Sequence, residues 1–555
     1  MLHNSLLQPK SIVIIGGSDN IHSPGGSVLK NLIDHKFSGQ LFVVNPKKRK
    51  VQGIKSYLDI NDIPPVDLAI IAIAAKYIVE TVKILTQQKN TKGFIIFSAG
   101  FSEKDEQGAK MESEIVSLIN KAGGSLLGPN NIGLINKNYT GVFTQPIPKL
   151  DNNGVDFISG SGATAVFIME AAQSVGLTFS SIYTVGNSAQ VGVEEILEHL
   201  DYNYIEKESS KVKLLYIESI KNPSKFLKHT KSLIKKGCKI AAIKAGNSEE
   251  GNRAASSHTG AMATSDVFVE ALFEKSGIIR CNGRYELITV AGILLQKESS
   301  GKNIGIITHA GGPAVMLTDT LAKNGLKIPE LKEKLSSKLL MELYEGSSVT
   351  NPIDFLATGT AKQLETIIDY CENKFDNIDA MAVIFGSPGL APVYDVYDVL
   401  NKKIKSSKKP IYSILPSVVN VKNEINDFIS KGNIAFDDEV LFGNSLAKVY
   451  NSVQPDHKEN LIDPDTFNNI RKIIDILPNG YITSSQANDL LNLIGINFVQ
   501  QKEVKNETDL LKIAHTLGYP VVLKVIGPLH KSDVGGVELN IKNNQDILNS
   551  IKKLM

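Results

Sequence analysis

One local pattern occurs three times in this chain: a short apolar strand runs into a glycine-rich turn, and a helical stretch follows. The copies are "SIVIIGGSDN" (11–20), "VDFISGSGATAVFIMEAA" (155–172) and "IGIITHAGGPAVMLTDTLA" (304–322). Equivalent strand positions, Ile14, Ile158 and Ile307, are 144 and 149 residues apart, which is the length of a domain. Buried apolar strands that alternate with amphipathic helices are typical of parallel sheets with helices on both faces. The sequence therefore predicts three doubly wound α/β domains in series.

Polar segments that contain proline or glycine interrupt both periodicities at residues 146–154 and 296–303. Beyond residue 455 the pattern changes to two helical stretches, followed by strand-like alternation at 495–504 and 518–541, which indicates antiparallel pairing. A fourth and different domain is therefore expected. The expected domains, in chain order, are residues 1–146, 150–297, 302–455 and 462–555.

The composition excludes several classes of partner. With 60 Lys and Arg against 58 Asp and Glu, the net charge is +2, and no basic stripe indicates nucleic-acid binding. The apolar run at 66–75 is about half the ~20 residues that a membrane-spanning helix needs. The cysteines, Cys238, Cys281 and Cys371, lack metal-ligand spacing and are typical of reduced, partly buried thiols. We expect a cytoplasmic protein that binds neither nucleic acid nor membrane.

Polar loops follow four strand ends of the first expected domain, at residues 16–20, 43–48, 97–108 and 127–135. Ligands of such sheets bind at the carboxyl ends of the strands. The first loop lacks the spacing of a dinucleotide fingerprint, which argues against NAD. Its glycines either present backbone N–H groups to a phosphate or only permit tight packing. Four such loops in one sheet favour a nucleotide-like ligand.

A single imidazole, His258, stands in the small, polar loop "RAASSHTG" (253–260). A neutral imidazole is nucleophilic near pH 7, and a phosphohistidine can hold a phosphoryl group between two reactions. The small neighbours leave room for that group. From these residues alone, a solvated or capping histidine is the commoner outcome for such a loop.

The glycine turns, the strand-end loops and the loop of His258, in their order along the chain, resemble the motifs of a known family. Further parts of the resemblance are "GNSAQVGVEEILEHL" (186–200), "KAG" (244–246), "NPIDF" (351–355) and "HKSDVGGV" (530–537). The family is that of the NDP-forming acyl-CoA synthetases, which includes succinyl-CoA synthetase and ADP-forming acetate–CoA ligase. The resemblance covers essentially the whole chain, in the order of the fused, single-chain members. It implies a Rossmann-like CoA-binding domain, two flavodoxin-like domains and the start of an ATP-grasp domain.

The resemblance assigns catalytic roles to three residues. The phosphorylated histidine of the family matches His258, and the glutamate that orients it matches Glu218. A second histidine, a relay near the nucleotide, matches His530, and the strand lysine that reaches nucleotide phosphates matches Lys524. Judged without the resemblance, Glu218 could equally be a surface carboxylate, Lys524 an exposed strand lysine and His530 a polar residue beside a hairpin. His309 is expected to be structural.

The resemblance also implies two sets of ligand-binding residues. The phosphate-binding set is Ser161, Gly162, Asn187 and Gly260. The CoA-binding set is Gly16, Ser18, Asn45, Pro46, Lys47, Ser98, Gly100 and Asn130. Two positions depart from the family pattern, because Gly160 stands where glutamine is common and Gln190 where an acidic residue is common. No metal ligand is assigned to any residue of this chain.

The implied reaction is carboxylic acid + CoA + ATP ⇌ acyl-CoA + ADP + phosphate, through acyl phosphate and phosphohistidine, with acetate as the default acid. CoA, ATP or ADP, and Mg²⁺ are the implied cofactors. Because an ATP-grasp domain is longer than residues 462–555, the resemblance implies that the Mg²⁺ ligands and the rest of the adenine cleft lie on further residues or on a partner chain. Nucleotide turnover by this chain alone is therefore not expected. Association into a homo-oligomer is the other expected assembly.

Two alternatives remain open at this point. A CoA or acyl-CoA sensor or scaffold would have kept the fold and lost nucleotide chemistry. The incomplete ATP-grasp segment favours this alternative, whereas the intact "SSHTG" and Glu218 oppose it. A fused protein acetyltransferase would need an additional acetyltransferase domain, and we find none in the sequence.

Overall fold

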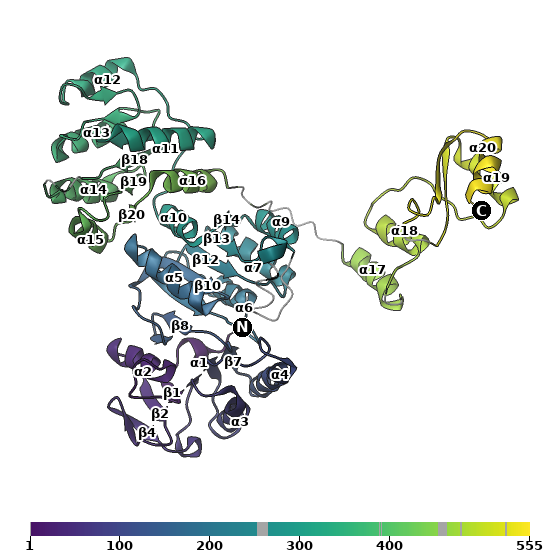
Figure 1. The fold of residues 1–555 in the computed structure, drawn as a ribbon, viewed down its shortest axis with the longest axis horizontal. Helices are drawn as coiled ribbons and strands as arrows, with labels where there is room; N and C mark the ends of the chain where they lie inside the picture. Colours follow the sequence, from purple (N-terminus) through teal and green to yellow (C-terminus); the bar gives the residue numbers. More distant parts are fainter. Residues whose placement is uncertain are drawn as a thin grey trace. The chain divides into compact units, whose positions relative to one another are not determined.

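The computed structural model describes residues 2–251, 253, 265–387, 389, 391–452, 455, 463–477, 480–527 and 530–554. The chain divides into two compact units, Met1–Pro455 and Asp456–Met555. The first unit contains sheets of seven, seven and six strands, and the second contains a two-stranded sheet. Figure 1 shows the helices that flank the sheets of the first unit. This architecture confirms the predicted fold class, α/β with mostly parallel sheets, while the four expected domain limits stay a prediction.

The first sheet has the topology of a Rossmann-like domain. Its strands in spatial order are β3 (Lys50–Val51), β4 (Ile54–Tyr57), β2 (Gln40–Val44), β1 (Ser11–Ile15), β5 (Leu68–Ile71), β6 (Gly93–Ile96) and β7 (Ser125–Leu127). All neighbours pair in parallel except β3 and β4. The helices of this part are α1 (Asn4–Leu7), α2 (Pro24–Asp34), η1 (Ile60–Asp62), η2 (Ala75–Tyr77), α3 (Ile78–Gln88) and α4 (Glu106–Lys121). The strand order reverses between β1 and β5, where such folds place their ligands.

The second sheet is also mostly parallel. Its strands in spatial order are β14 (Ile279–Cys281), β13 (Lys239–Lys244), β12 (Val212–Ile217), β10 (Leu150–Ser159), β11 (Phe179–Thr184), β8 (Gly133–Asn136) and β9 (Tyr139–Val142). The helices are α5 (Gly162–Ser174), α6 (Val193–Tyr202), α7 (Pro223–Lys235), α9 (Asp266–Ser276) and α10 (Arg284–Leu294). The β8–β9 hairpin precedes the expected limit at residue 146, yet β8 pairs antiparallel with β11. The strand order reverses between β10 and β12.

The third sheet repeats the arrangement with six strands. In spatial order these are β16 (Ser348–Val349), β17 (Ile353–Asp354), β15 (Ile304–Thr308), β18 (Ala380–Ile384), β19 (Ile411–Ile414) and β20 (Ala435–Phe436). The helices are α11 (Gly311–Lys323), α12 (Glu333–Leu340), α13 (Ala361–Asn373), α14 (Tyr394–Ser406), α15 (Lys422–Ser430) and α16 (Glu439–Tyr450). The glycine turn after β15 thus leads into α11, as the sequence predicts.

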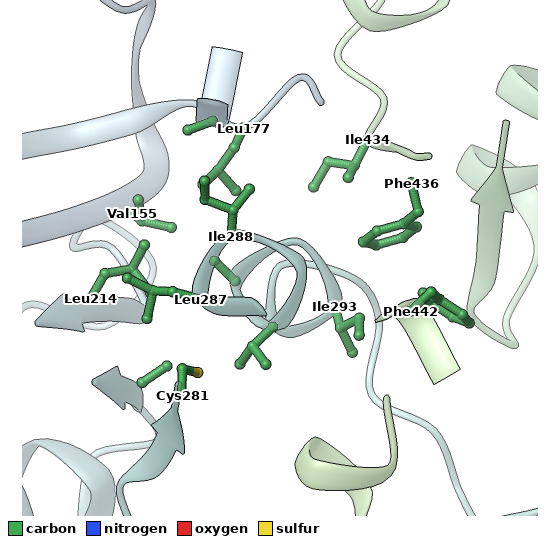
Figure 2. Close-up of a cluster of buried hydrophobic side chains, with 14 of the residues drawn as sticks. Val155, Leu177, Leu214, Cys281, Leu287, Ile288, Ile293, Ile434, Phe436 and Phe442 are labelled. Carbon is green, nitrogen blue, oxygen red and sulfur yellow. The ribbon is translucent and has the colours of Figure 1, made fainter. Parts of the chain in front are cut away.

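One hydrophobic core joins the second and third sheets. Helix α10 is apolar on nearly all sides and buries seven consecutive residues, 287–293, as a helix enclosed by protein does. Figure 2 shows Leu287 and Ile288 among side chains from the second sheet and its loops, and Ile293 toward Phe436 of β20 and Phe442 of α16. A Cβ on Gly292 would lie 3.0 Å from the Phe436 ring, so the helix backbone packs tightly there.

The second unit contains α17 (Pro464–Ile476), α18 (Ser484–Leu493), α19 (Glu507–Leu517), β21 (Val521–Lys524), β22 (Val537–Ile541) and α20 (Asn544–Leu554). The antiparallel hairpin β21–β22 confirms the strand pattern predicted at 518–541. The strand predicted at 495–504 is wrong: the segment is exposed and irregular. Alternating apolar residues form a strand only where another strand accepts their hydrogen bonds, and no strand in the described residues pairs with this one.

The three cysteines are free and buried, and burial raises the pKa of Cys281 and Cys371 to about 12. This confirms that they are packing residues. None of the helices in the described ranges combines the length and the apolar character needed to cross a bilayer.

Candidate functional site

A cavity of about 760 Å³ lies where strand-end loops of the first and second sheets meet. Its walls come from the loops after β6, β7, β11 and β12 and from the first turn of α5. Five residues that the sequence nominated for three different roles line it together: Asn130, Ser161, Gly162, Asn187 and Glu218. Positions up to 88 residues apart, from Asn130 to Glu218, thus meet at one site because both sheets direct their strand ends toward it.

The N-terminus of α5 forms the anion-binding wall. Ser161 is its N-cap, and its Oγ accepts a hydrogen bond from the Thr164 N–H at 3.3 Å. The hydroxyl of Ser159, the last residue of β10, donates to the Ser161 carbonyl at 2.7 Å and fixes the turn. The remaining N–H groups of the first turn and the positive end of the helix dipole favour a negatively charged ligand. This wall can hold a phosphate or a carboxylate.

Glu218 stands beside that wall. It follows β12, whereas Gly160 follows β10, and these neighbouring strands flank the point where the strand order reverses. A Cβ on Gly160 would lie 3.4 Å from the Glu218 Cγ, an ordinary contact, so Gly160 lies directly beside the Glu218 side chain. Burial and, secondarily, the Glu218 charge raise the pKa of Tyr216. Glu218 is a half-buried carboxylate of the cavity and not a surface residue.

Asn187 connects the loops of the two sheets. Its Nδ2 donates to the Glu112 carboxylate at 2.9 Å, to the Ser102 Oγ at 3.3 Å and to the Glu103 carboxylate. Its Oδ1 accepts from the Asn130 Nδ2 at 3.3 Å. The Asn187 side chain therefore holds the first sheet against the second, and its contact with phosphate stays a prediction.

Two charged groups near the cavity escaped the sequence reasoning. Burial opposes ionisation of Glu103, but hydrogen bonds from the Gly100 N–H, the Asn187 amide and the Phe101 N–H lower its pKa. Lys221 lines the cavity and donates from Nζ to the Ser188 carbonyl at 2.7 Å. Its place three residues after Glu218, on the same strand-end loop, was the signal that could have identified it.

The turn after β1 has a shape that only glycine permits. Gly16 has φ +89°, and a Cβ there would lie 2.6 Å from the Ala72 carbonyl oxygen after β5. The Gly16 turn thus packs directly against the loop that follows β5, at the point where the strand order reverses. The helix begins later than the sequence pattern indicates, at Pro24, with Ser23 as N-cap. Ser18 stays in the turn, where its Oγ accepts from the Asn20 N–H at 3.0 Å.

Hydrogen bonds join the other expected CoA-binding residues into two groups. Near β1 and β2, the Asn45 Nδ2 donates to the Gly17 carbonyl at 2.8 Å, and Pro46 and Lys47 follow as exposed residues. Near β6 and β7, the Asn130 N–H donates to the Ser98 carbonyl at 3.1 Å. Gly100 has φ +108° in the same loop as Ser98. Both groups lie at the carboxyl ends of the first sheet, which suits an extended ligand.

The other nominated residues lie elsewhere. His258 and Gly260 fall outside the described residues. Lys524 ends β21, and His530 belongs to the loop between β21 and β22; both are exposed in the second unit. The His309 Nε2 lies 2.6 Å from the Gly386 carbonyl oxygen, and its ring meets Phe385 edge-on, which is a packing role.

The described residues do not fit a metal site. They contain no group of three or more His, Cys, Asp or Glu side chains that could hold an ion. Mg²⁺ therefore enters no step that we derive from this structure.

Three family models match this chain. A CoA binding domain matches residues 10–137, a succinyl-CoA ligase like flavodoxin domain matches 152–294, and an ATP-grasp domain matches 478–555. They agree with the CoA-binding, flavodoxin-like and ATP-grasp folds expected from the sequence.

Proteins of known function are similar over most of the chain. The ADP-forming acetate–CoA ligase I of Archaeoglobus fulgidus is 31% identical over 97% of this chain and 78% of its own length. Subunit alpha of the ADP-forming acetate–CoA ligase II of Pyrococcus furiosus is 33% identical over 75% of this chain and 90% of its own. A solved acetyl-coenzyme A synthetase 1 of Ca. Korarchaeum cryptofilum, in complex with phosphate and ADP, shares the fold with a TM-score of 0.71 at 24% identity, over 80% of this chain and 96% of that one. This chain belongs to the family of ADP-forming acid–CoA ligases.

Proposed function

We propose that this chain interconverts acyl-CoA, phosphate and ADP with carboxylic acid, CoA and ATP by way of a phosphoryl group carried on His258. The observation that carries the proposal is the convergence of Glu218 and the α5 N-terminus on one cavity with the CoA-side residue Asn130. An anion-binding helix start and a carboxylate beside it are what phosphoryl transfer to an imidazole requires. Because this chain belongs to the family of ADP-forming acid–CoA ligases, we expect it to use CoA and an adenine nucleotide.

The first step joins phosphate to the acyl group. A phosphate oxygen, held by the N–H groups of Gly162 and Ala163 and by the Ser161 hydroxyl, attacks the thioester carbonyl carbon. The carbon–sulfur bond breaks, CoA leaves as its thiolate, and the thiolate takes up the proton that phosphate loses. The products are acyl phosphate and CoA. In the reverse direction, the same N–H groups hold the phosphate that leaves.

The second step moves the phosphoryl group to the protein. One nitrogen of His258 attacks phosphorus, the bond from phosphorus to the acyl oxygen breaks, and the carboxylate leaves. Glu218 accepts the hydrogen bond of the other ring N–H, which keeps the attacking nitrogen unprotonated and stabilises the charge that develops on the ring. ADP then attacks phosphorus, the phosphorus–nitrogen bond breaks, and ATP forms. By their match to the family, Lys524 and His530 serve this last transfer.

The proposed partners follow from this reaction: a carboxylic acid with acetate as the default, CoA, phosphate, an adenine nucleotide, and either a second copy of the chain or a partner chain. The Pyrococcus furiosus relative is a subunit of its ligase, which supports a multichain assembly. The alternative of a non-catalytic CoA sensor is not favoured, because the relatives over nearly the whole chain are ligases.

The decisive experiment labels the full chain with ³²P-acetyl phosphate and measures acid-labile, alkali-stable protein phosphate. We expect labelling of the unaltered chain, none in His258→Ala and at least about tenfold slower labelling in Glu218→Gln. CoA binding, measured by calorimetry, should persist in all three proteins. His515→Ala, which changes an exposed histidine of α19, is the control and should label normally. Normal labelling of His258→Ala would refute the proposal.

A further inference from the structure

The site cavity contains one positively charged side chain that the proposed reaction steps do not use. Among the described lining residues Lys221 is the one cation, whereas Glu112 and Glu218 are carboxylates. Apolar side chains such as Phe143 and Val166 line other parts of the cavity, and surroundings of low polarity strengthen the interactions between charges. A phosphate dianion that enters this cavity therefore meets two carboxylates, and the helix start alone offers it only partial positive charges.

The Lys221 backbone is fixed by a buried carboxylate. Glu194, the second residue of α6, is 3% exposed. One of its oxygens accepts hydrogen bonds from the Lys221 N–H at 2.7 Å and from the Asn222 N–H at 2.9 Å. These two hydrogen bonds hold the turn that follows Glu218, so the Lys221 side chain starts from a fixed backbone position.

The ammonium group of Lys221 is held as well. Its Nζ donates to the Ser188 carbonyl at 2.7 Å and to the Asn187 carbonyl at 3.2 Å. An ammonium group has three N–H donors, and acceptors among the described residues occupy two of them. The third N–H of Lys221 can therefore donate to an oxygen of a ligand in the cavity.

The loop that accepts these hydrogen bonds is itself anchored to the first sheet. The Asn187 N–H donates to the Pro129 carbonyl at 3.0 Å, and the Ala189 N–H donates to the Gly128 carbonyl at 3.2 Å. Lys221 thus donates to a loop of fixed position. Its long side chain loses little further rotational freedom when a ligand binds, which lowers the entropic cost of that contact.

We propose that Lys221 is a further catalytic residue: its ammonium group donates a hydrogen bond to the phosphoryl group held at the start of α5 and offsets the negative charges of Glu112 and Glu218. This inference rests on the proposed function, since it concerns the phosphate of that same reaction. The N–H groups of Gly162 and Ala163 and the ammonium group then hold the phosphate together. Because a charged donor interacts more strongly with a dianion than with a neutral thioester, Lys221 should govern the phosphate dependence of the reaction.

The test measures the release of CoA from acetyl-CoA by the full chain at increasing phosphate concentration and constant ionic strength. A thiol reagent detects CoA and draws the reaction forward, and the buried cysteines do not disturb it. We expect Lys221→Met to lower kcat/KM for phosphate about ten- to hundredfold, which is the effect of losing a hydrogen bond from a charged group. The KM for acetyl-CoA should change less than about twofold.

Two further variants separate the charge of Lys221 from its hydrogen bonds to the loop. The amide of Lys221→Gln can still donate to the Asn187 and Ser188 carbonyls but carries no charge, so this variant should show a loss similar to that of Lys221→Met. It also replaces Lys221→Met if that variant does not fold. Lys221→Arg keeps the charge and should recover most of the lost kcat/KM for phosphate.

Lys228→Met is the matched control, because Lys228 is an exposed lysine of α7 that does not line the cavity. Its phosphate dependence should equal that of the unaltered chain. An equilibrium measurement tests the contact without turnover: phosphate at constant ionic strength should raise the melting temperature of the unaltered chain and of Lys228→Met more than that of Lys221→Gln.

Equal effects of phosphate on the melting temperatures of Lys221→Gln and Lys228→Met would overturn the inference. A raised KM for acetyl-CoA with an unaltered phosphate dependence would also overturn it, because the ammonium group would then belong to the CoA site. If the unaltered chain releases no CoA but phosphate still stabilises it through Lys221, the proposed function fails and the phosphate contact of Lys221 is supported.

Discussion

Replacement of Lys213 by methionine should destabilise the second sheet strongly while it leaves the chemistry of the site unaltered. Lys213 of β12 lies in register with Asp156 of β10, and Asp156 in turn with Ser181 of β11. The Lys213 Nζ lies 2.6 Å from an Asp156 carboxylate oxygen, and the two side chains are 1% and 6% exposed. The Ser181 hydroxyl donates to the other carboxylate oxygen. The substitution therefore leaves Asp156 as a buried charge without its cation.

The loss of one partner from such a buried pair costs about 3–5 kcal/mol in the free energy of unfolding. The second and third sheets share one core and should unfold together. For a cooperative unit of about 300 residues each kcal/mol lowers Tm by about 1–2 °C, so their common transition should fall by about 3–10 °C. The site should be less affected, because Lys213 precedes Glu218 by five residues, or about 16 Å along an extended strand. The double variant Lys213→Met with Asp156→Leu removes both charges and should recover at least half of the lost stability.

The assay is calorimetry of the full chain, supported by hydrogen exchange of the amides in β10 and β12. Lys332→Met is the control: its ion pair with Asp376 is 2.7 Å long but exposed, so we expect a loss below about 1 kcal/mol. Our reasoning is refuted if Lys213→Met costs no more than Lys332→Met, or if the double variant is less stable than the single one.

Gly16→Ala should weaken CoA binding, measured by calorimetry, at least about tenfold, because its Cβ would meet the Ala72 carbonyl at 2.6 Å; Gly53→Ala, with φ +85° and open space, carries only the backbone strain of about 1–3 kcal/mol and should bind CoA normally. Equal effects of the two substitutions on CoA affinity would contradict this. Because the pKa of Glu103 in the folded protein lies below its ordinary value of 4.5, its contribution to stability is complete above about pH 4.5 and is lost as the pH falls through the folded pKa. Melting temperatures should therefore decline more steeply below pH 4.5 in the unaltered chain than in Glu103→Gln, and parallel curves would exclude this role.

The repeated strand, turn and helix pattern was sufficient to predict the three α/β sheets, because strands buried on both faces have an unmistakably apolar sequence. The pattern failed at 495–504, where alternation occurs without a pairing strand. It also could not show that β8 joins the second sheet, because the partner of an edge strand depends on contacts between residues far apart in the chain.

For the site, the sequence identified side chains of recognisable chemistry, such as Glu218 and Ser161, and the structure places both in one cavity. It did not identify Lys221, Phe143 or Val166. Valine and phenylalanine have the same appearance in a sequence whether they fill a core or line a ligand cavity, and only the fold separates the two cases. The opposite difficulty arises at Asn187, which the sequence nominates as a phosphate ligand. In the structure its Nδ2 already donates hydrogen bonds to Glu112 and to Ser102 and Glu103 in the loop after β6.

The packing of α10 has a consequence for how this polypeptide could be divided. Leu287 and Ile293 belong to the same hydrophobic core as Phe436 and Phe442. The second and third sheets should therefore unfold together and be encoded in one polypeptide. Cleavage of the chain between the two sheets, or their expression from separate genes, would expose a large apolar surface on each fragment. A viable split into two subunits should therefore fall after α16, which ends at Tyr450, and two separately expressed halves divided near residue 300 should be insoluble.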